Sequence, residues 1–257
     1  MTDLFDLTGR VALVTGATGG LGSAICAALA SHGARVILSD LDSASCDSAA
    51  AALRDQGWEA RALACDMRDR SSIHKMCHDA LSFWDRLDVL VCNAGVQGPA
   101  GPLGAVTSAD WNLVMDINLG GPMALTTEAI PHMVSVGGGS VILLSSIAGL
   151  RGNSAIGLYA LSKAGVAQLA RNLAVEWGPS NVRVNAVSPG LIRTPLAADL
   201  LKDEVFMHRR LAATPLRRVG EPHEVAGVVV MLASRAGAFI SGHNLVVDGG
   251  TTISDGS

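Results

Sequence analysis

The stretch Val11-Ala12-Leu13-Val14-Thr15-Gly16-Ala17-Thr18-Gly19-Gly20-Leu21-Gly22 decides the fold of this chain. Its first five residues are apolar or β-branched, which is typical of a buried strand in a parallel sheet. The glycine-rich turn leads into an alanine-rich stretch, residues 23–31, that favours a helix. Glycines let a backbone approach a phosphate closely, and a helix N-terminus offers free N–H groups. The spacing Gly-x-x-x-Gly-x-Gly, in this strand–turn–helix context, therefore predicts a dinucleotide phosphate site.

An acidic residue follows the next apolar run. Asp40 directly follows the run 35–39 and lies about 20 positions beyond the glycine turn. A carboxylate at this position is placed to accept hydrogen bonds from an adenosine ribose. Its charge would repel a 2′-phosphate, and residues 16–22 contain no Arg or Lys to attract one. The sequence thus favours NAD over NADP. The alternative is that Asp40 is a loop residue or helix cap beside Asp42 and Ser43.

Tyr159 and Lys163 are four residues apart, and Tyr159 is the only tyrosine of the chain. On a helix this spacing puts both side chains on one face. A tyrosine pKa of about 10 would have to fall by about 3 units to suit acid–base chemistry near neutral pH. One unit charge about 4 Å away supplies roughly the 4 kcal/mol required at an effective dielectric of about 20. The pair therefore predicts a general acid–base, or else a packed ring beside a solvated lysine stem.

Strand-like and helix-like segments alternate along the chain. We expect strands near residues 11–15, 35–39, 60–64, 88–92, 140–145, 182–187 and 244–247, and helices near 20–32, 43–56, 71–84, 108–135, 157–178 and 222–233. This order predicts an α/β protein with a Rossmann-like, doubly wound, seven-stranded parallel sheet and helices on both faces. Without an internal repeat or linker, we expect residues 1–257 to form one domain.

Composition narrows the class of protein. Hydrophobic residues make up 49% of the chain and charged residues 16%. A sheet covered on both faces explains much of this, and helix faces buried between subunits would explain the rest, which favours an oligomer. A net charge of −4 lacks the excess of basic residues that is typical of nucleic-acid-binding proteins. The uncharged run 129–150 is broken by Pro131 and by the glycines at 137–139, which argues against a membrane span.

The cysteines and histidines suggest no metal site or disulfide framework. The five cysteines have no Cys-x-x-Cys spacing, and the N-terminus lacks a signal-peptide pattern. We expect reduced thiols in a cytoplasmic protein. His74 and His78 share a helix face with spacing that can hold a metal, but no third ligand is evident nearby, so we expect a solvated face and no metal.

The chain resembles the short-chain dehydrogenase/reductase family from about residue 7 to residue 252. The resemblance rests on several motifs in the family's order. They are the turn 15–22, Asp66 after the apolar run 60–64, Asn93-Ala94-Gly95, Asn118 in Met115-Asp116-Ile117-Asn118, Ser146 thirteen residues before Tyr159, Pro189-Gly190 followed by Thr194, and Asp248-Gly249-Gly250.

The resemblance implies a dehydrogenase, in which Tyr159 exchanges a proton with the substrate oxygen. Lys163 would lower the Tyr159 pKa and hold the nicotinamide ribose, Ser146 would orient the substrate oxygen, and Asn118 would hold a water that links Lys163 to solvent. The nicotinamide would supply the hydride chemistry. The residues expected to contact the cofactor are Gly16, Thr18, Gly19, Gly20, Leu21, Asp40, Leu41, Asp66, Met67, Asn93, Ala94, Gly95, Tyr159, Lys163, Pro189, Gly190, Ile192 and Thr194.

The substrate is less constrained. Besides Ser146 and Tyr159, we expect Gln97, Leu150 and Asn153 to contact it, with further pocket walls at Val96, Ile147 and Leu158. Residues 191–211 should form a lid with an apolar inner face. The basic residues in and beside the lid (Arg193, Lys202, His208, Arg209 and Arg210) either bind a carboxylate or face solvent.

Three functions remain open within the resemblance. The start of the chain and the lid segment 202–206 resemble family members that act on gluconate-like sugar acids. A 3-ketoacyl reductase is an alternative, although such enzymes use NADP. A cofactor-binding sensor of the same fold is the non-catalytic alternative, and the complete set of four catalytic residues favours an enzyme. The family also implies a homotetramer.

Overall fold

Seven parallel strands form the centre of the molecule in this computed structural model, which describes residues 3–254. In chain order the strands are β1 (Val11–Thr15), β2 (Arg35–Asp40), β3 (Ala60–Ala64), β4 (Val89–Cys92), β5 (Gly139–Leu144), β6 (Val182–Pro189) and β7 (Asn244–Val247). Their spatial order is β3-β2-β1-β4-β5-β6-β7, and all pairs are parallel. The predicted sheet and fold class are confirmed.

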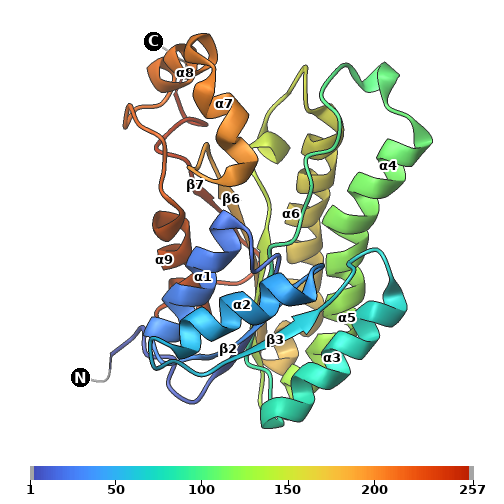
Figure 1. Ribbon diagram of the computed structural model, residues 1–257, viewed down its shortest axis with the longest axis vertical. Coiled ribbons are helices and arrows are strands. Elements are labelled where there is room, and N and C mark those ends of the chain that lie inside the picture. The colour runs from blue at the N-terminus through green and yellow to red at the C-terminus, as the bar shows by residue number, and fades with distance from the viewer. Residues whose placement is uncertain (1–2, 255–257) are drawn as a thin grey trace.

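Helices cover both faces of this sheet (Figure 1). They are α1 (Gly20–Ser31), α2 (Ser43–Arg54), α3 (Arg70–Trp84), α4 (Ser108–Met115), α5 (Gly121–Ser135), α6 (Gly157–Trp177), α7 (Ala198–Lys202), α8 (Glu204–Ala212) and α9 (Pro222–Ala233). Strand order reverses at β1, which pairs with β2 on one side and β4 on the other. Ligands bind beyond the carboxyl ends of the strands at such a switch point.

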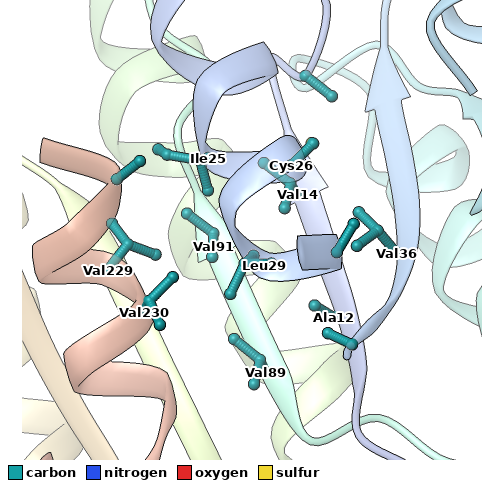
Figure 2. Close-up of a cluster of buried hydrophobic side chains, with 14 of the residues drawn as sticks. Ala12, Val14, Ile25, Cys26, Leu29, Val36, Val89, Val91, Val229 and Val230 are labelled. Carbon is teal, nitrogen blue, oxygen red and sulfur yellow. The ribbon is translucent and has the colours of Figure 1, made fainter. Parts of the chain in front are cut away.

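Alternate residues of each strand face opposite layers of the core. On β1, Ala12 and Val14 belong to the cluster that packs α1 and α9 onto the sheet (Figure 2), whereas Val11 and Leu13 belong to the cluster beneath α3, α5 and α6. All four are fully buried. Because successive side chains of a strand point to opposite faces, each strand contributes to two hydrophobic cores, one on each side of the sheet. This is why the strands are nearly continuous apolar runs.

Side-chain caps fix where several helices begin. The Asp42 carboxylate accepts a hydrogen bond from the Ser45 N–H at the start of α2, and Asp69 accepts one from Ser71 at the start of α3. Thr107 and Asp110 form a reciprocal capping box at α4. Each cap satisfies N–H groups that lack a partner within the helix and contributes about 1 kcal/mol.

The prediction of one continuous helix over residues 108–135 is wrong, because the range is interrupted. A π-helical segment, Asp116–Gly120, separates α4 from α5. Gly121 packs there against Met67, since a Cβ at Gly121 would lie 2.7 Å from the Met67 carbonyl oxygen. Helix α5 then continues through Pro131 to Ser135. The extra residue in the helical turn places Asn118 in the interior, with 1% of its surface exposed.

Residues 191–211, predicted as a lid, contain α7 and most of α8, which stand above the start of α1 in Figure 1. The segment touches the glycine turn directly. A Cβ at Gly20 would lie 2.7 Å from Pro195 Cδ. Within residues 3–254, no helix is both long and apolar enough to cross a membrane.

Candidate functional site

A cleft of about 780 Å³ opens at the carboxyl ends of the strands. All of the residues predicted to contact the cofactor line it, as do Gln97, Ser146 and Asn153. Two predicted site residues, Asn118 and Leu150, do not. The structure therefore brings motifs from residue 16 to residue 194 into one continuous cavity.

The glycine turn permits a close approach of α1 to the end of β1. A Cβ at Gly22 would lie 2.0 Å from the Gly16 carbonyl oxygen, and Gly16 itself has a φ of +63°, which favours glycine. The Asn93 amide holds the turn by donating to the carbonyl oxygens of Thr15 (3.1 Å) and Gly16 (2.9 Å). Helix α1 has no acidic residue in its first turn and no side-chain cap. Its N-terminus thus fits a pyrophosphate.

The Asp40 carboxylate ends β2 at the rim of this cleft. Its Oδ2 accepts hydrogen bonds from the Thr18 N–H (3.0 Å) and hydroxyl (2.6 Å), and its Oδ1 accepts one from the Leu41 N–H (2.8 Å). Asp40 therefore also holds the glycine turn, a contact that sequence reasoning missed. An ionised carboxylate has about four lone-pair sites, so capacity remains for ribose hydroxyls.

Asp66 lies beside the same part of the cleft, after β3. Its carboxylate forms a bidentate ion pair with Arg68, whose Nη2 lies 2.6 Å from Asp66 Oδ2. Arg68 lines the cleft and was not predicted as a site residue. The ion pair lowers the Asp66 pKa, so this acid stays ionised at neutral pH.

Tyr159, Lys163 and Ser146 meet at the other end of the cleft. Tyr159 and Lys163 lie in the first two turns of α6, and Ser146 follows β5. The Lys163 Nζ lies 5.6 Å from the centre of the Tyr159 ring and donates a hydrogen bond to the Leu144 carbonyl oxygen at 2.7 Å. The Ser145 hydroxyl donates to the Lys163 carbonyl oxygen at 2.7 Å, which fixes α6 against the end of β5.

Burial dominates the pKa of both titratable groups. It lowers the pKa of Lys163 to about 8 because the ammonium is removed from water. It also raises the pKa of Tyr159, while the hydrogen bond with Ser146 opposes that rise. The predicted lowering by Lys163 is not seen in this state. The Lys163 Nζ is 5.6 Å from the ring centre and donates to the Leu144 carbonyl oxygen, and burial of the phenol is the largest influence on the Tyr159 pKa.

Asn118 sits behind this group and not in the cleft. Its Oδ1 accepts from the Val96 N–H at 2.8 Å, and its Nδ2 donates to the Val96 carbonyl oxygen at 2.8 Å and to the Ser162 hydroxyl at 3.0 Å. The side chain thus ties the loop after β4 to α6 next to Lys163. Both of its N–H donors are used, so its predicted role in a water relay stays a prediction.

The remaining wall of the cleft is apolar with two cations. Its lining residues include Ile117, Ile147, Ala148, Arg151, Ile156, Leu196, Leu200 and Arg210. Leu150, predicted as a substrate contact, is 47% exposed. Gly149, just before it, packs tightly on α6, since a Cβ there would lie 2.6 Å from the Ala164 nitrogen. The predicted wall residue Leu158 is buried outside the cleft.

The histidine pair on α3 does not line the cleft. The His74 Nδ1 is 3.0 Å from Glu128 of α5, a carboxylate partner that the sequence did not reveal. His78 is exposed beside Asp79. Across the described residues 3–254, no three metal-binding side chains converge.

Comparison with known proteins adds relatives over nearly the full length. A family model described as enoyl-(acyl carrier protein) reductase matches residues 16–252. A cis-4-hydroxycyclohexanecarboxylate dehydrogenase from Sinomonas cyclohexanicum is 41% identical over 243 residues, which are 95% of this chain and 96% of that protein.

Two solved structures are also similar. One is a gluconate 5-dehydrogenase from Burkholderia cenocepacia in complex with NADP and tartrate, with 30% identity, 98% of each chain covered and a TM-score of 0.95. The other is a 7α-hydroxysteroid dehydrogenase with NADH and 7-oxo glycochenodeoxycholic acid, with 32% identity, 97% of each chain covered and a TM-score of 0.93. One relative holds NADP and the other NADH.

The buried ammonium predicts a pH-dependent stability. The Lys163 pKa falls from 10.5 to about 8 on folding, so the unfolded chain binds more protons between these values and stability rises with pH through that window. Lys163→Met removes the charge and should stabilise the fold at pH 7 by roughly 3 kcal/mol at most, less the lost Leu144 hydrogen bond. The gain should shrink towards pH 10.5. Urea unfolding at pH 7 and pH 10 measures this, with exposed Lys202→Met as control. Equal changes in the free energy of unfolding for the two variants at both pH values would contradict the burial of the Lys163 ammonium.

Proposed function

The chain belongs to the short-chain dehydrogenase/reductase family of oxidoreductases, and from this premise we propose that it interconverts a secondary alcohol and a ketone using NAD. The observation that carries this proposal is one shared cleft. Ser146, Tyr159 and Lys163 line one end of it, and the glycine turn and Asp40 line the other. Asp40 and Ser146 follow strands three places apart in the sheet, which is roughly 14 Å at about 4.8 Å per strand. That span suits an extended dinucleotide.

The protein's own residues would hold the cofactor at both ends. The N-terminus of α1 binds the pyrophosphate, Asp40 accepts hydrogen bonds from the adenosine ribose, and Lys163 reaches the second ribose. When bound, the nicotinamide supplies the hydride chemistry. Pro189, Gly190 and Thr194 line the same cleft, with Thr194 beside Gly20 of the glycine turn, and would position the ring.

Tyr159 exchanges the proton at the substrate oxygen. Ser146 hydrogen-bonds that oxygen and holds it against the phenol, and the phenol and Ser146 already interact in the structure. Lys163 lies over the phenol ring, and its positive charge favours the phenolate. A water relay past Asn118 would return the proton to solvent. In alcohol oxidation Tyr159 acts as base, and in ketone reduction it acts as acid.

The names of the relatives define a substrate panel. It comprises cis-4-hydroxycyclohexanecarboxylate, gluconate and a hydroxysteroid, together with a 3-ketoacyl thioester and simple secondary alcohols. Activity with NAD on any member separates an enzyme from a cofactor-binding sensor.

The five free cysteines, all buried, suit the reducing environment of the cytoplasm.

Removing one oxygen tests the catalytic assignment. Tyr159→Phe keeps the ring and should lower turnover by about 10²–10⁴-fold, the usual contribution of a general acid–base. NADH binding, measured by calorimetry, should stay within a few-fold of wild type because the dinucleotide contacts lie elsewhere. Near-normal turnover would show that another group transfers the proton.

Cofactor choice is tested at Asp40. Wild type should show a higher kcat/KM with NAD than with NADP. Asp40→Ala should erode that ratio by about 10- to 100-fold, the equivalent of one charge-assisted hydrogen bond, together with the lost repulsion. Since Asp40 also holds Thr18, Asp40→Asn serves as a second variant that keeps hydrogen-bonding capacity but removes the charge. A wild-type preference for NADP, or an unchanged ratio in both variants, would overturn this role.

Exposed apolar side chains support the proposed homotetramer. Trp111, Met123 and Leu161 on α4, α5 and α6 are 46%, 45% and 48% exposed, and Phe239 and Ile253 near the C-terminus are 105% and 88% exposed. Such side chains gain free energy when a second copy covers them. Light scattering at micromolar concentration should give four times the 26.3 kDa chain mass. Phe239→Asp should shift the mass to dimer or monomer, and a wild-type monomer would refute the assembly.

A further inference from the structure

The basic residues in and beside the lid differ in what they contact. Arg193 pairs with Glu221 at 3.0 Å, and Lys202 lies 3.7 Å from Asp199. His208 and Arg209 are exposed and do not line the cleft. Arg210 alone of this group lines the substrate end of the cleft. Arg210 therefore differs from the neighbouring basic residues in lining the cleft.

Arg210 is half-buried but has no anionic partner of its own. Its guanidinium lies 5.6 Å from the centre of the Phe206 ring, one helical turn earlier on α8, which supports it against the cleft wall. Within residues 3–254, no carboxylate forms an ion pair with it. Asp248 acts on it at longer range, but the two Asp248 oxygens accept hydrogen bonds from the Gly250 and Thr252 N–H groups.

A second cation, which is exposed to solvent, lines the same cleft from a different element. Arg151 follows the short 3-10 turn Ile147–Leu150 that begins at Ser146, and it lines the same cleft. The Asn153 amide donates to the Arg151 carbonyl oxygen at 3.1 Å and to that of Ala148 at 3.2 Å, which fixes this loop. Burial lowers the pKa of the Arg210 guanidinium, and the nearby charge of Arg151 lowers it further. Two converging like charges are unfavourable until an anion lies between them.

The acidic residues of the cleft are at its far end. Asp40 and Asp66 follow β2 and β3, whereas Ser146 and Arg151 follow β5. No Asp or Glu lines the cleft around Tyr159. Asp248, which acts on Arg210 at longer range, does not line this cleft, so the described lining residues at the substrate end include two cations and no carboxylate.

We propose that Arg210 and Arg151 bind the carboxylate of the substrate, so that this enzyme acts on hydroxy acids whose alcohol carbon lies at Tyr159 and Ser146. Apolar residues that line the same cleft, among them Ile147, Ile156 and Leu200, would contact the carbon skeleton that joins the two groups. A planar guanidinium binds a carboxylate with two parallel hydrogen bonds, which fixes the orientation of the acid as well as its charge. This inference rests on the dehydrogenase function proposed above.

The test compares an acid with its neutral counterpart. Wild type should oxidise cis-4-hydroxycyclohexanecarboxylate with a KM well below that for its methyl ester or for cyclohexanol. Arg210→Gln should raise the KM for the acid by about 10- to 100-fold, as expected for a hydrogen bond to a charged group, with kcat less affected. The ester should change by less than about threefold. Arg151→Gln should act in the same direction, and Arg210→Lys should restore part of the affinity.

Arg209→Gln is the matched control, because it removes the same charge from the adjacent exposed position. It should leave the acid kinetics unchanged. An equal loss for acid and ester in Arg210→Gln, or an equal loss in Arg209→Gln, would overturn the proposal. So would a wild type that oxidises the neutral alcohols as efficiently as the acid.

A binding measurement separates this proposal from the dehydrogenase function. Cyclohexanecarboxylate has the acid but no alcohol to oxidise, so calorimetry in the presence of NADH reports carboxylate binding without turnover. Binding to wild type that weakens in Arg210→Gln but not in Arg209→Gln supports the clamp even if no panel alcohol is oxidised. Absence of binding to wild type refutes the clamp, whereas binding without oxidation of any panel member counts only against the proposed reaction.

Discussion

The close approach of α1 to the end of β1 is the constraint on which the site depends. It exists because Gly22 has no side chain, since a Cβ there would overlap the Gly16 carbonyl oxygen. That contact directs the helix N-terminus into the cleft and leaves its first N–H groups free for an anion. Asn93 and Asp40 hold the turn from either side, by hydrogen bonds to Gly16 and Thr18. The residues that border the cofactor site are thus also the residues that shape it.

At Lys163, the requirement of the proposed chemistry opposes the stability of the fold. Lys163 is 4% exposed and has a backbone carbonyl rather than a carboxylate as its partner. Burying an ammonium without a counter-charge is costly, which is why its pKa falls. The two cores beneath it, on opposite faces of the sheet, supply the free energy that offsets this cost. A neutral side chain at position 163 would suit the fold better and the proposed chemistry worse.

Local sequence patterns predicted the fold because its strands and turns are encoded locally. Residues 11–15 are an unbroken run of apolar or β-branched residues, and the glycines that follow can adopt the positive φ and the close backbone contact that the turn requires. Local sequence did not indicate the π-helical segment around Asn118, which is followed by the close packing of Gly121 on Met67, more than 50 residues earlier in the chain. Leu150, predicted as a substrate contact, lies outside the cleft for a similar reason: Gly149 packs on α6, and Leu150 is left exposed.

The paired arginines show the same limit at the substrate end. Arg210 is one of several basic residues in its segment, and nothing in the sequence distinguishes it from Arg209. Only the orientation of α8 separates a cation that lines the cleft from one that does not, and only the loop after β5 brings Arg151 to the same cleft. The acidic lining residues Asp40 and Asp66 lie at one end of the cleft, where Arg68 pairs with Asp66, whereas Arg151 and Arg210 line the cleft without a carboxylate in an ion pair. Under the proposed function, the Asp40 carboxylate disfavours an added phosphate on the cofactor and the two guanidiniums favour an acidic substrate.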